Sequence, residues 1–135
     1  MKRLLVILSA FSLASCAMMN INSHRMKAAQ RKMLDTRKLQ QAGQWDESLA
    51  MAERMRSSVS KSVASAPNQK SAAGMLVDTR PLLAAWENGP FAELKTALQK
   101  RDASRSTAAF ASLRQQCVNC HTVLGKPQAQ VSEIP

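Results

Sequence analysis

Apolar side chains recur every three or four residues along most of the chain, and this spacing predicts amphipathic helices. The pattern is clearest between Asp46 and Pro67. No stretch alternates apolar and polar positions as a half-buried strand would. We therefore expect an all-α domain. The predicted apolar face of that clearest helix consists of Leu49, Ala52, Met55, Val59 and Val63.

Capping residues and breaks set the expected ends of the first two helices. The first begins near Asn22 or Ser23, both good N-caps, and stops at Gly43. The second is capped by Asp46 and ends before Pro67.

The third region, residues 71–101, is interrupted. Pro81 fits the first turn of a helix capped by Asp78 or Thr79, and the run 88–90 (Asn-Gly-Pro) is a strong break. The sequence leaves open whether this region forms one bent helix or two.

The last helix starts near Asp102 or Ser104 and ends at Gly125, which leaves residues 127–135 as a frayed tail. Four principal helices with short connections favour an antiparallel four-helix bundle.

The N-terminus has the pattern of an export signal. Lys2 and Arg3 precede an apolar run of about ten residues, which is too short for a stable membrane anchor. The run leads into Leu-Ala-Ser-Cys16, which resembles the bacterial lipoprotein processing box. We expect a signal peptide at 1–15, a lipidated Cys16 in a tether at 16–22, and a helical domain at 23–126. The alternative is an ordinary signal peptide cut after Ala14 or Ala17, which would release a soluble periplasmic protein.

The candidate chemistry lies near the C-terminus, where Cys117-Val118-Asn119-Cys120-His121 has the C-x-x-C-H spacing of c-type haem attachment. Two thiols about one helical turn apart can reach both vinyl groups of one porphyrin. His121 can then act as the proximal iron ligand. This predicts one covalent haem c per chain.

Other uses of this motif are weaker. A C-x-x-C pair also occurs in redox dithiols and zinc sites, but no strand precedes this one, no second Cys pair exists, and His24 is the only other His. Two ordinary thiols beside an ordinary His remain an alternative. Export agrees with haem attachment, and lipidation of Cys16 would leave no cysteine unexplained.

A C-x-x-C-H motif in the last helix of a four-helix bundle resembles the class II c-type cytochromes, the cytochrome c-prime group. The resemblance covers about the last 45 residues and includes Trp86, Phe91-Ala92-Glu93-Leu94, Ala108-Ala109-Phe110 and Leu113. Trp86 lies closer to the motif than in that family, and no basic residue follows the motif directly. The resemblance implies a haem protein that is often a homodimer.

The resemblance also implies that a side chain of the first helix packs against the sixth position of the iron. Met33 is the first candidate and Met26 the second; His24, Met51, Met55, Met75 or no ligand remain open. Met is also common core filler. A Met ligand would favour one-electron transfer, whereas an open position would favour binding of nitric oxide or carbon monoxide.

The chain is strongly basic, with 19 Lys and Arg against 9 Asp and Glu and a net charge of +10. This favours an acidic redox partner or an anionic membrane over nucleic acid, which an exported chain seldom meets. Outside the motif no catalytic constellation is visible, so we expect no enzyme. We expect an electron carrier, with a gas-binding protein and a haem-free envelope lipoprotein as alternatives. The basic residues expected near the haem edge are Arg114, Lys126 and Arg25 or Lys27.

Overall fold

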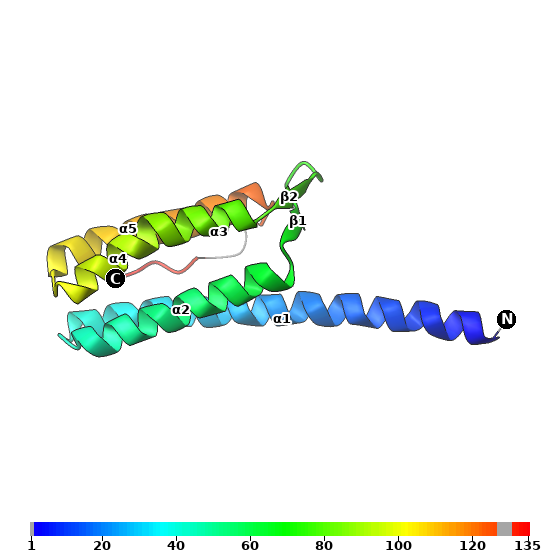
Figure 1. The fold of residues 1–135 in the computed structure, drawn as a ribbon, viewed down its shortest axis with the longest axis horizontal. Helices are drawn as coiled ribbons and strands as arrows, with labels where there is room; N and C mark the ends of the chain where they lie inside the picture. Colours follow the sequence, from blue (N-terminus) through cyan, green and yellow to red (C-terminus); the bar gives the residue numbers. More distant parts are fainter. Residues whose placement is uncertain (1, 127–130) are drawn as a thin grey trace.

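The computed structural model describes residues 2–126 and 131–135, with side chains from residue 21 onward. The chain is mostly helical, which confirms the expected class (Figure 1). One helical hairpin comprises α1 and α2, and a second comprises the bent run α3–η1–α4 together with α5. Figure 1 shows the two hairpins facing each other. The elements are α1 (Lys2–Gln41), α2 (Trp45–Ser65), β1 (Asn68–Lys70), β2 (Leu76–Asp78), α3 (Arg80–Trp86), η1 (Glu87–Phe91), α4 (Ala92–Gln99) and α5 (Ala103–Val123).

The predicted end of the first helix is confirmed, but its predicted start is wrong. Gly43 adopts φ 74°, and the amide of Gln44 donates to the carbonyl of Leu39 (2.9 Å), as in a Schellman motif. At the other end, α1 runs without a break from Lys2 through the expected caps Asn22 and Ser23. The residues that precede these caps include no Gly or Pro, so nothing in them interrupts the helix.

The second helix is capped two residues earlier than expected, and its buried face overlaps only in part with the predicted one. Its N-cap is Gln44, and Asp46 lies in the first turn, where a carboxylate favours the helix dipole. The buried positions are Ser48, Ala52, Met55, Ser58 and Ser62. Ala52 and Met55 of the predicted face are therefore confirmed, and its Leu49 and Val59 are half-buried against the core, while three serines that the prediction left out are also buried. The Ser48 hydroxyl donates to the carbonyl of Thr36 (2.8 Å), which satisfies a polar group at the buried α1–α2 contact.

A short β-hairpin follows α2, in contrast to the strand-free chain that we expected. Asn68 pairs with Asp78 and Lys70 with Leu76 in antiparallel register. Gly74, with φ 78°, lies in the connecting loop. Strands of three residues carry too little alternation to be recognised in a sequence.

The interrupted third region forms one bent helical run from Arg80 to Gln99. Thr79 occupies the N-cap position with Pro81 in the first turn, as predicted. The bend is at Gly89 (φ −99°, ψ −106°), just before Pro90. Across the bend, the rings of Trp86 and Phe91 stack at 5.2 Å, which fills the core where the backbone changes direction.

The last helix begins and ends where the sequence predicted. The Asp102 side chain accepts a hydrogen bond from the amide of Arg105 (2.9 Å), and Gly125 adopts φ 65° beyond the last turn. Its buried stripe of Ala109, Phe110 and Leu113 packs in the core with residues of all the longer helices.

The predicted frayed tail is wrong for residues 131–135; residues 127–130 lie outside the described part. Val131 and Ile134 pack against the core. Arg114 donates to the carbonyls of Ser132 (3.0 Å) and Val131 (3.1 Å), and Gln30 of α1 also binds Ser132. The tail therefore ties α1 to α5 through contacts that its own composition does not indicate.

Replacing Arg114 with Ala tests this attachment. Because the guanidinium binds two tail carbonyls from a mostly buried position, we expect the free energy of unfolding to fall by ~1–3 kcal/mol. Thermal unfolding and limited proteolysis of the C-terminus would measure it. The matched control is Arg105→Ala, which removes an exposed guanidinium from the same helix and should change stability little. Equal effects of the two substitutions would contradict the assignment.

Candidate functional site

The motif residues lie together on the last two turns of α5. Cys117 and His121, four positions apart, share one stripe, and Cys120 lies about one sixth of a turn aside. Both cysteines are free and all three residues are half-buried. The helix thus presents two thiols about one turn apart on neighbouring faces, with the imidazole directly after them.

Cys117 faces the core and Cys120 is less enclosed. Burial raises the pKa of the Cys117 thiol to about 11, and the neighbouring Cys120 makes a smaller contribution in the same direction. Trp86 and Arg114 oppose that shift. Burial also raises the pKa of Cys120. Both thiols are therefore neutral at physiological pH, unlike the thiolates of redox dithiols. This environment gives no support to the redox-dithiol alternative.

Two buried polar atoms near this end of the molecule have no hydrogen-bond partner among the described residues: Trp86 Nε1 and Asn22 Oδ1. Trp86 is 5% exposed, and its indole N–H faces the Cys117 thiol without reaching hydrogen-bond geometry. An unsatisfied buried donor costs stability, so such a group calls for an acceptor. In the sequence, only the family resemblance singled out Trp86 as a residue near the candidate site.

The backbone around His121 is held by the end of the helix. The amide of Lys126 donates to the His121 carbonyl (2.8 Å), and the amide of Gly125 donates to that of Thr122 (3.0 Å). A Cβ on Gly125 would lie 2.9 Å from Cα of Ala72 in the β-hairpin loop. Only glycine suits this position, because both its φ and its contact with Ala72 exclude a side chain.

Contacts between α1 and α5 set the level of each Met along the molecule. Arg37 donates to Thr107 (3.0 Å), and Gln30 and Arg114 both bind Ser132. The two helices run in opposite directions (Figure 1). Toward the β-hairpin, residue numbers therefore decrease along α1 and increase along α5.

This register separates the two candidates for the sixth position. Met33 lies level with Ala111, about 15 Å along the axis from His121, and it is 2% exposed in the core. Met26 lies level with Val118, about 5 Å from His121 along the same axis, and is half-buried. Along the axis, Met26, the second candidate of the sequence, therefore lies nearer to the level of His121 than Met33 does.

The expected basic surface is rearranged. Arg114 is occupied by the tail and by Glu133, so its charge is not available to a partner. Lys126 remains exposed and reaches Gln69 (3.1 Å), while Arg25 binds the end of α2 through Ser65. Lys126 and Lys27 are the exposed basic side chains that remain from the expected set.

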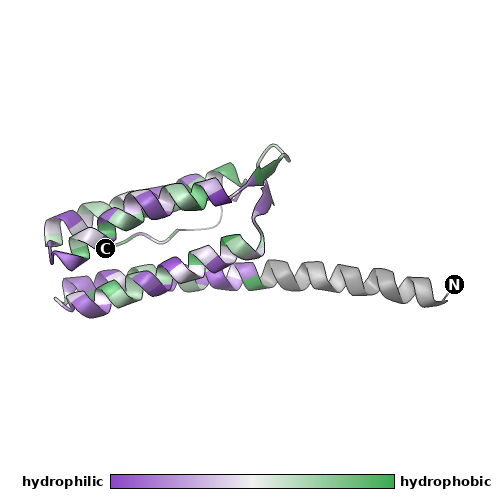
Figure 2. Ribbon diagram, viewed as in Figure 1, coloured by the Kyte–Doolittle hydropathy of each residue, from purple (hydrophilic) through white to green (hydrophobic). Residues whose placement is uncertain are grey.

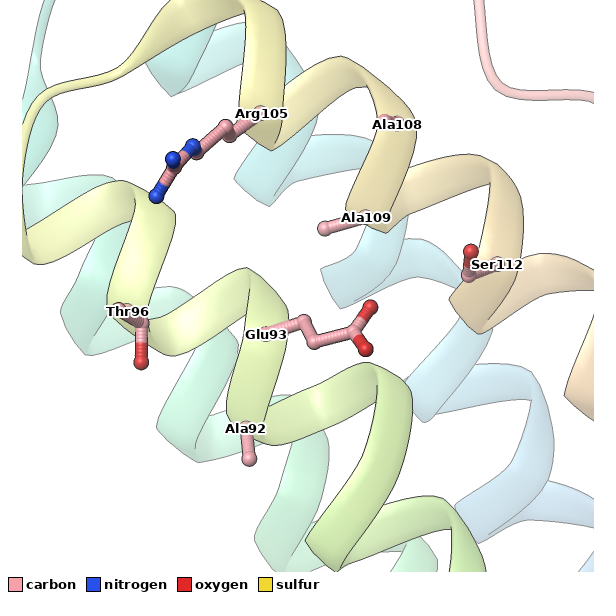
Figure 3. A pocket seen from close by; sticks show the side chains of 7 residues that line it. All are labelled: Ala92, Glu93, Thr96, Arg105, Ala108, Ala109 and Ser112. Carbon is pink, nitrogen blue, oxygen red and sulfur yellow. The ribbon is translucent and has the colours of Figure 1, made fainter.

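A hollow of about 430 Å³ opens elsewhere, between α4 and α5 (Figure 3). Small side chains form much of its wall, and Glu93 and Arg105 project from opposite helices. It is not lined by the motif residues. In the described residues no three His, Cys, Asp or Glu side chains gather as ligands of one ion.

No family model, curated protein or solved structure matches the chain. The resemblance to class II cytochromes therefore rests on the residues of the C-terminal third. Among residues 21–126 and 131–135, no helix is long and apolar enough to cross a membrane.

Alkylation of protein made without haem tests the environment of the two thiols. With a pKa of about 11, roughly one Cys117 in a hundred is ionised at pH 9, against half for a thiol with the ordinary value of 9.0. We expect iodoacetamide to modify Cys120 first, as measured by peptide mass mapping. Because folding raises the pKa of Cys117, stability should fall as pH rises from about 9 toward 11. Faster modification of Cys117 would contradict its burial.

Proposed function

We propose that the protein is a monohaem c-type cytochrome that carries single electrons in the bacterial cell envelope. The observation that supports this best is the placement of Cys117, Cys120 and His121 on the end of one helix, with Cys117 turned toward the core. We infer that the two helical hairpins form the antiparallel four-helix bundle of the class II type. No chemistry beyond electron transfer is proposed.

The residues present fit a covalently held haem. Cys117 and Cys120 would form the two thioethers, and His121 would ligate the iron. When bound, haem supplies an iron that changes reversibly by one electron. The Trp86 N–H, buried without a partner beside Cys117, is suited to donate to an acceptor on a group held there.

Met26 is the side chain that we propose for the sixth position. Its thioether lies on α1 near the level of His121, and sulfur ligation raises the reduction potential and closes the iron to gases. Met33 instead fills the core beside Phe110, as Met commonly does. A closed iron favours electron transfer over gas binding.

Envelope location rests on the export signal and on Cys16. We propose residues 1–15 as the signal, 16–22 as the segment that leaves the membrane, and 23–126 as the haem domain. The partner would be an acidic redox protein of the periplasm, attracted by the exposed basic side chains. A homodimer remains an implication of the family resemblance.

The first test is haem staining after denaturing gel electrophoresis, because only thioether-bound haem survives it. The wild-type protein should stain, and the double substitution Cys117→Ala with Cys120→Ala should not. Cys16→Ala, which leaves the motif intact, is the matched control and should stain like wild type. Absence of stain in wild type purified from cells that make c-type cytochromes would leave the haem-free lipoprotein as the better function.

The sixth ligand is tested by the reduced spectrum with and without carbon monoxide. We expect wild type and Met33→Ala to ignore carbon monoxide and Met26→Ala to bind it, because only Met26 would occupy the iron. The reduction potential of Met26→Ala should also fall. A wild-type protein that binds carbon monoxide would make gas binding the function, and a response only in Met33→Ala would restore the first candidate.

Lipidation is tested by membrane partition of the exported protein. Cys16→Ala should release it in soluble form, because the acylated residue is lost. Ser15→Ala, which keeps a small residue in the processing box, should remain membrane-bound. Unchanged partition of Cys16→Ala would contradict lipidation.

A further inference from the structure

The β-hairpin carries the most exposed apolar side chains among the described residues. Met75 is 67% exposed and Leu76 71% exposed, and the neighbouring Val123 at the end of α5 is 45% exposed. The hairpin is held against α5, because the amide of Ala72 donates to the carbonyl of Val123 (3.3 Å). Figure 2 shows hydrophobic colour on the hairpin where it projects from the helices. These three side chains form what we name the apolar tip.

Basic side chains outnumber acidic ones at the end of the molecule that carries the apolar tip. The segments that meet at this end are residues 22–27, 61–80 and 120–126, and their only carboxylate is Asp78, which Arg80 binds (2.8 Å). Lys70 lies across the hairpin from Leu76, and Lys126 reaches Gln69 on the same hairpin. The basic residues of these segments are Arg25, Lys27, Lys61, Lys70, Arg80 and Lys126.

The opposite end of the molecule has a different charge pattern. There Asp46 and Glu47 open α2 and Asp102 caps α5, close to the basic residues of the α4–α5 turn. Arg101 pairs with Asp46 (3.5 Å). The excess of positive charge is therefore concentrated at the hairpin end.

The N-terminal part of α1 also leaves the molecule at the hairpin end (Figure 1). A chain tethered through Cys16 would hold this end nearest to the lipid. Three side chains, two on the projecting β-hairpin and one at the end of α5, are too few for the ~800 Å² that each partner of a standard protein interface buries. A narrow apolar projection at a basic end of the molecule instead suits the interface of an anionic bilayer, where apolar groups enter the acyl boundary and Lys contacts headgroups.

We propose that the apolar tip inserts into the surface of an anionic phospholipid bilayer, with Lys70 and Lys126 against the headgroups. This goes beyond electron transfer and does not depend on haem. It orients the molecule with the end of α5, and hence His121, toward the membrane. An electron partner would then approach along the side of the helices or be itself membrane-bound.

The test places an environment-sensitive dye on the full mature protein through Met75→Cys, with peptide mapping to confirm the labelled site. The protein also carries Cys16→Ala, so it has no lipid anchor, and vesicles of phosphatidylglycerol mixed with phosphatidylcholine are added until the emission stops changing. We expect a blue shift and quenching by brominated acyl chains. The control is Ser104→Cys, exposed at the opposite end, which should remain in water.

Charge and apolar contributions are separated by further variants. Lys70→Glu with Lys126→Glu should weaken the response at least about tenfold in lipid concentration, since each basic residue near an anionic surface contributes about 1 kcal/mol and the exchange reverses two charges. Leu76→Ser should also weaken it, and pure phosphatidylcholine should give little shift.

Three outcomes would overturn the proposal. The dye at position 75 could stay in water at saturating lipid, or the dye at position 104 could respond equally. The blue shift could also appear without lipid when the protein concentration is raised, which would indicate that the apolar tip binds a second copy of the chain. If the peptide map shows dye on Cys120, that thiol is free and carries no thioether to haem. The same experiment therefore distinguishes failure of the haem proposal from failure of the membrane proposal.

Discussion

The packing of α5 against the bent run α3–η1–α4 is the contact on which the candidate site depends. Phe110 and Leu113 are buried beside Phe91 and Leu94, and the same stripe continues to Cys117. Burial of this stripe fixes the rotation of α5, because turning the helix would expose its two largest core residues at a cost of several kcal/mol. The rotation in turn decides that Cys117 faces the core and that Cys120 lies closer to solvent.

Two devices at the ends of α5 preserve that arrangement. The carboxylate of Asp102 caps the first turn, and Gly125 closes the last turn against the β-hairpin. The tail then crosses back over the helix and is held by Arg114, one turn before Cys117. A motif at a helix end would otherwise fray, so these contacts supply the order that covalent attachment and iron ligation would need.

The two ends of the molecule differ in charge and in the features that they carry. The motif, the β-hairpin and the start of the helical body lie at one end with the excess positive charge, and the C-terminus lies at the other (Figure 1). The strongly basic composition therefore has a place in the structure: it borders the apolar tip rather than covering the whole surface. A single orientation at a membrane would account for the charge and for the exposed Met75 and Leu76.

Local signals alone determined the helical class, the cap at Asp102, the stop signals Gly43 and Gly125, and the motif with its helical phase. Each depends on residues within a few positions of one another, so the sequence carries the information directly. The tertiary structure alone decided the serine face of α2, the three-residue strands, the docked tail and the levels of Met26 and Met33. These depend on tertiary contacts that no local pattern announces. Arg37 with Thr107 joins two helices far apart in the sequence, and Arg114 with Ser132 joins α5 to a tail that has no periodic pattern. Spacing along one helix cannot reveal how far it slides against another, and that offset is what separates the two candidate ligands.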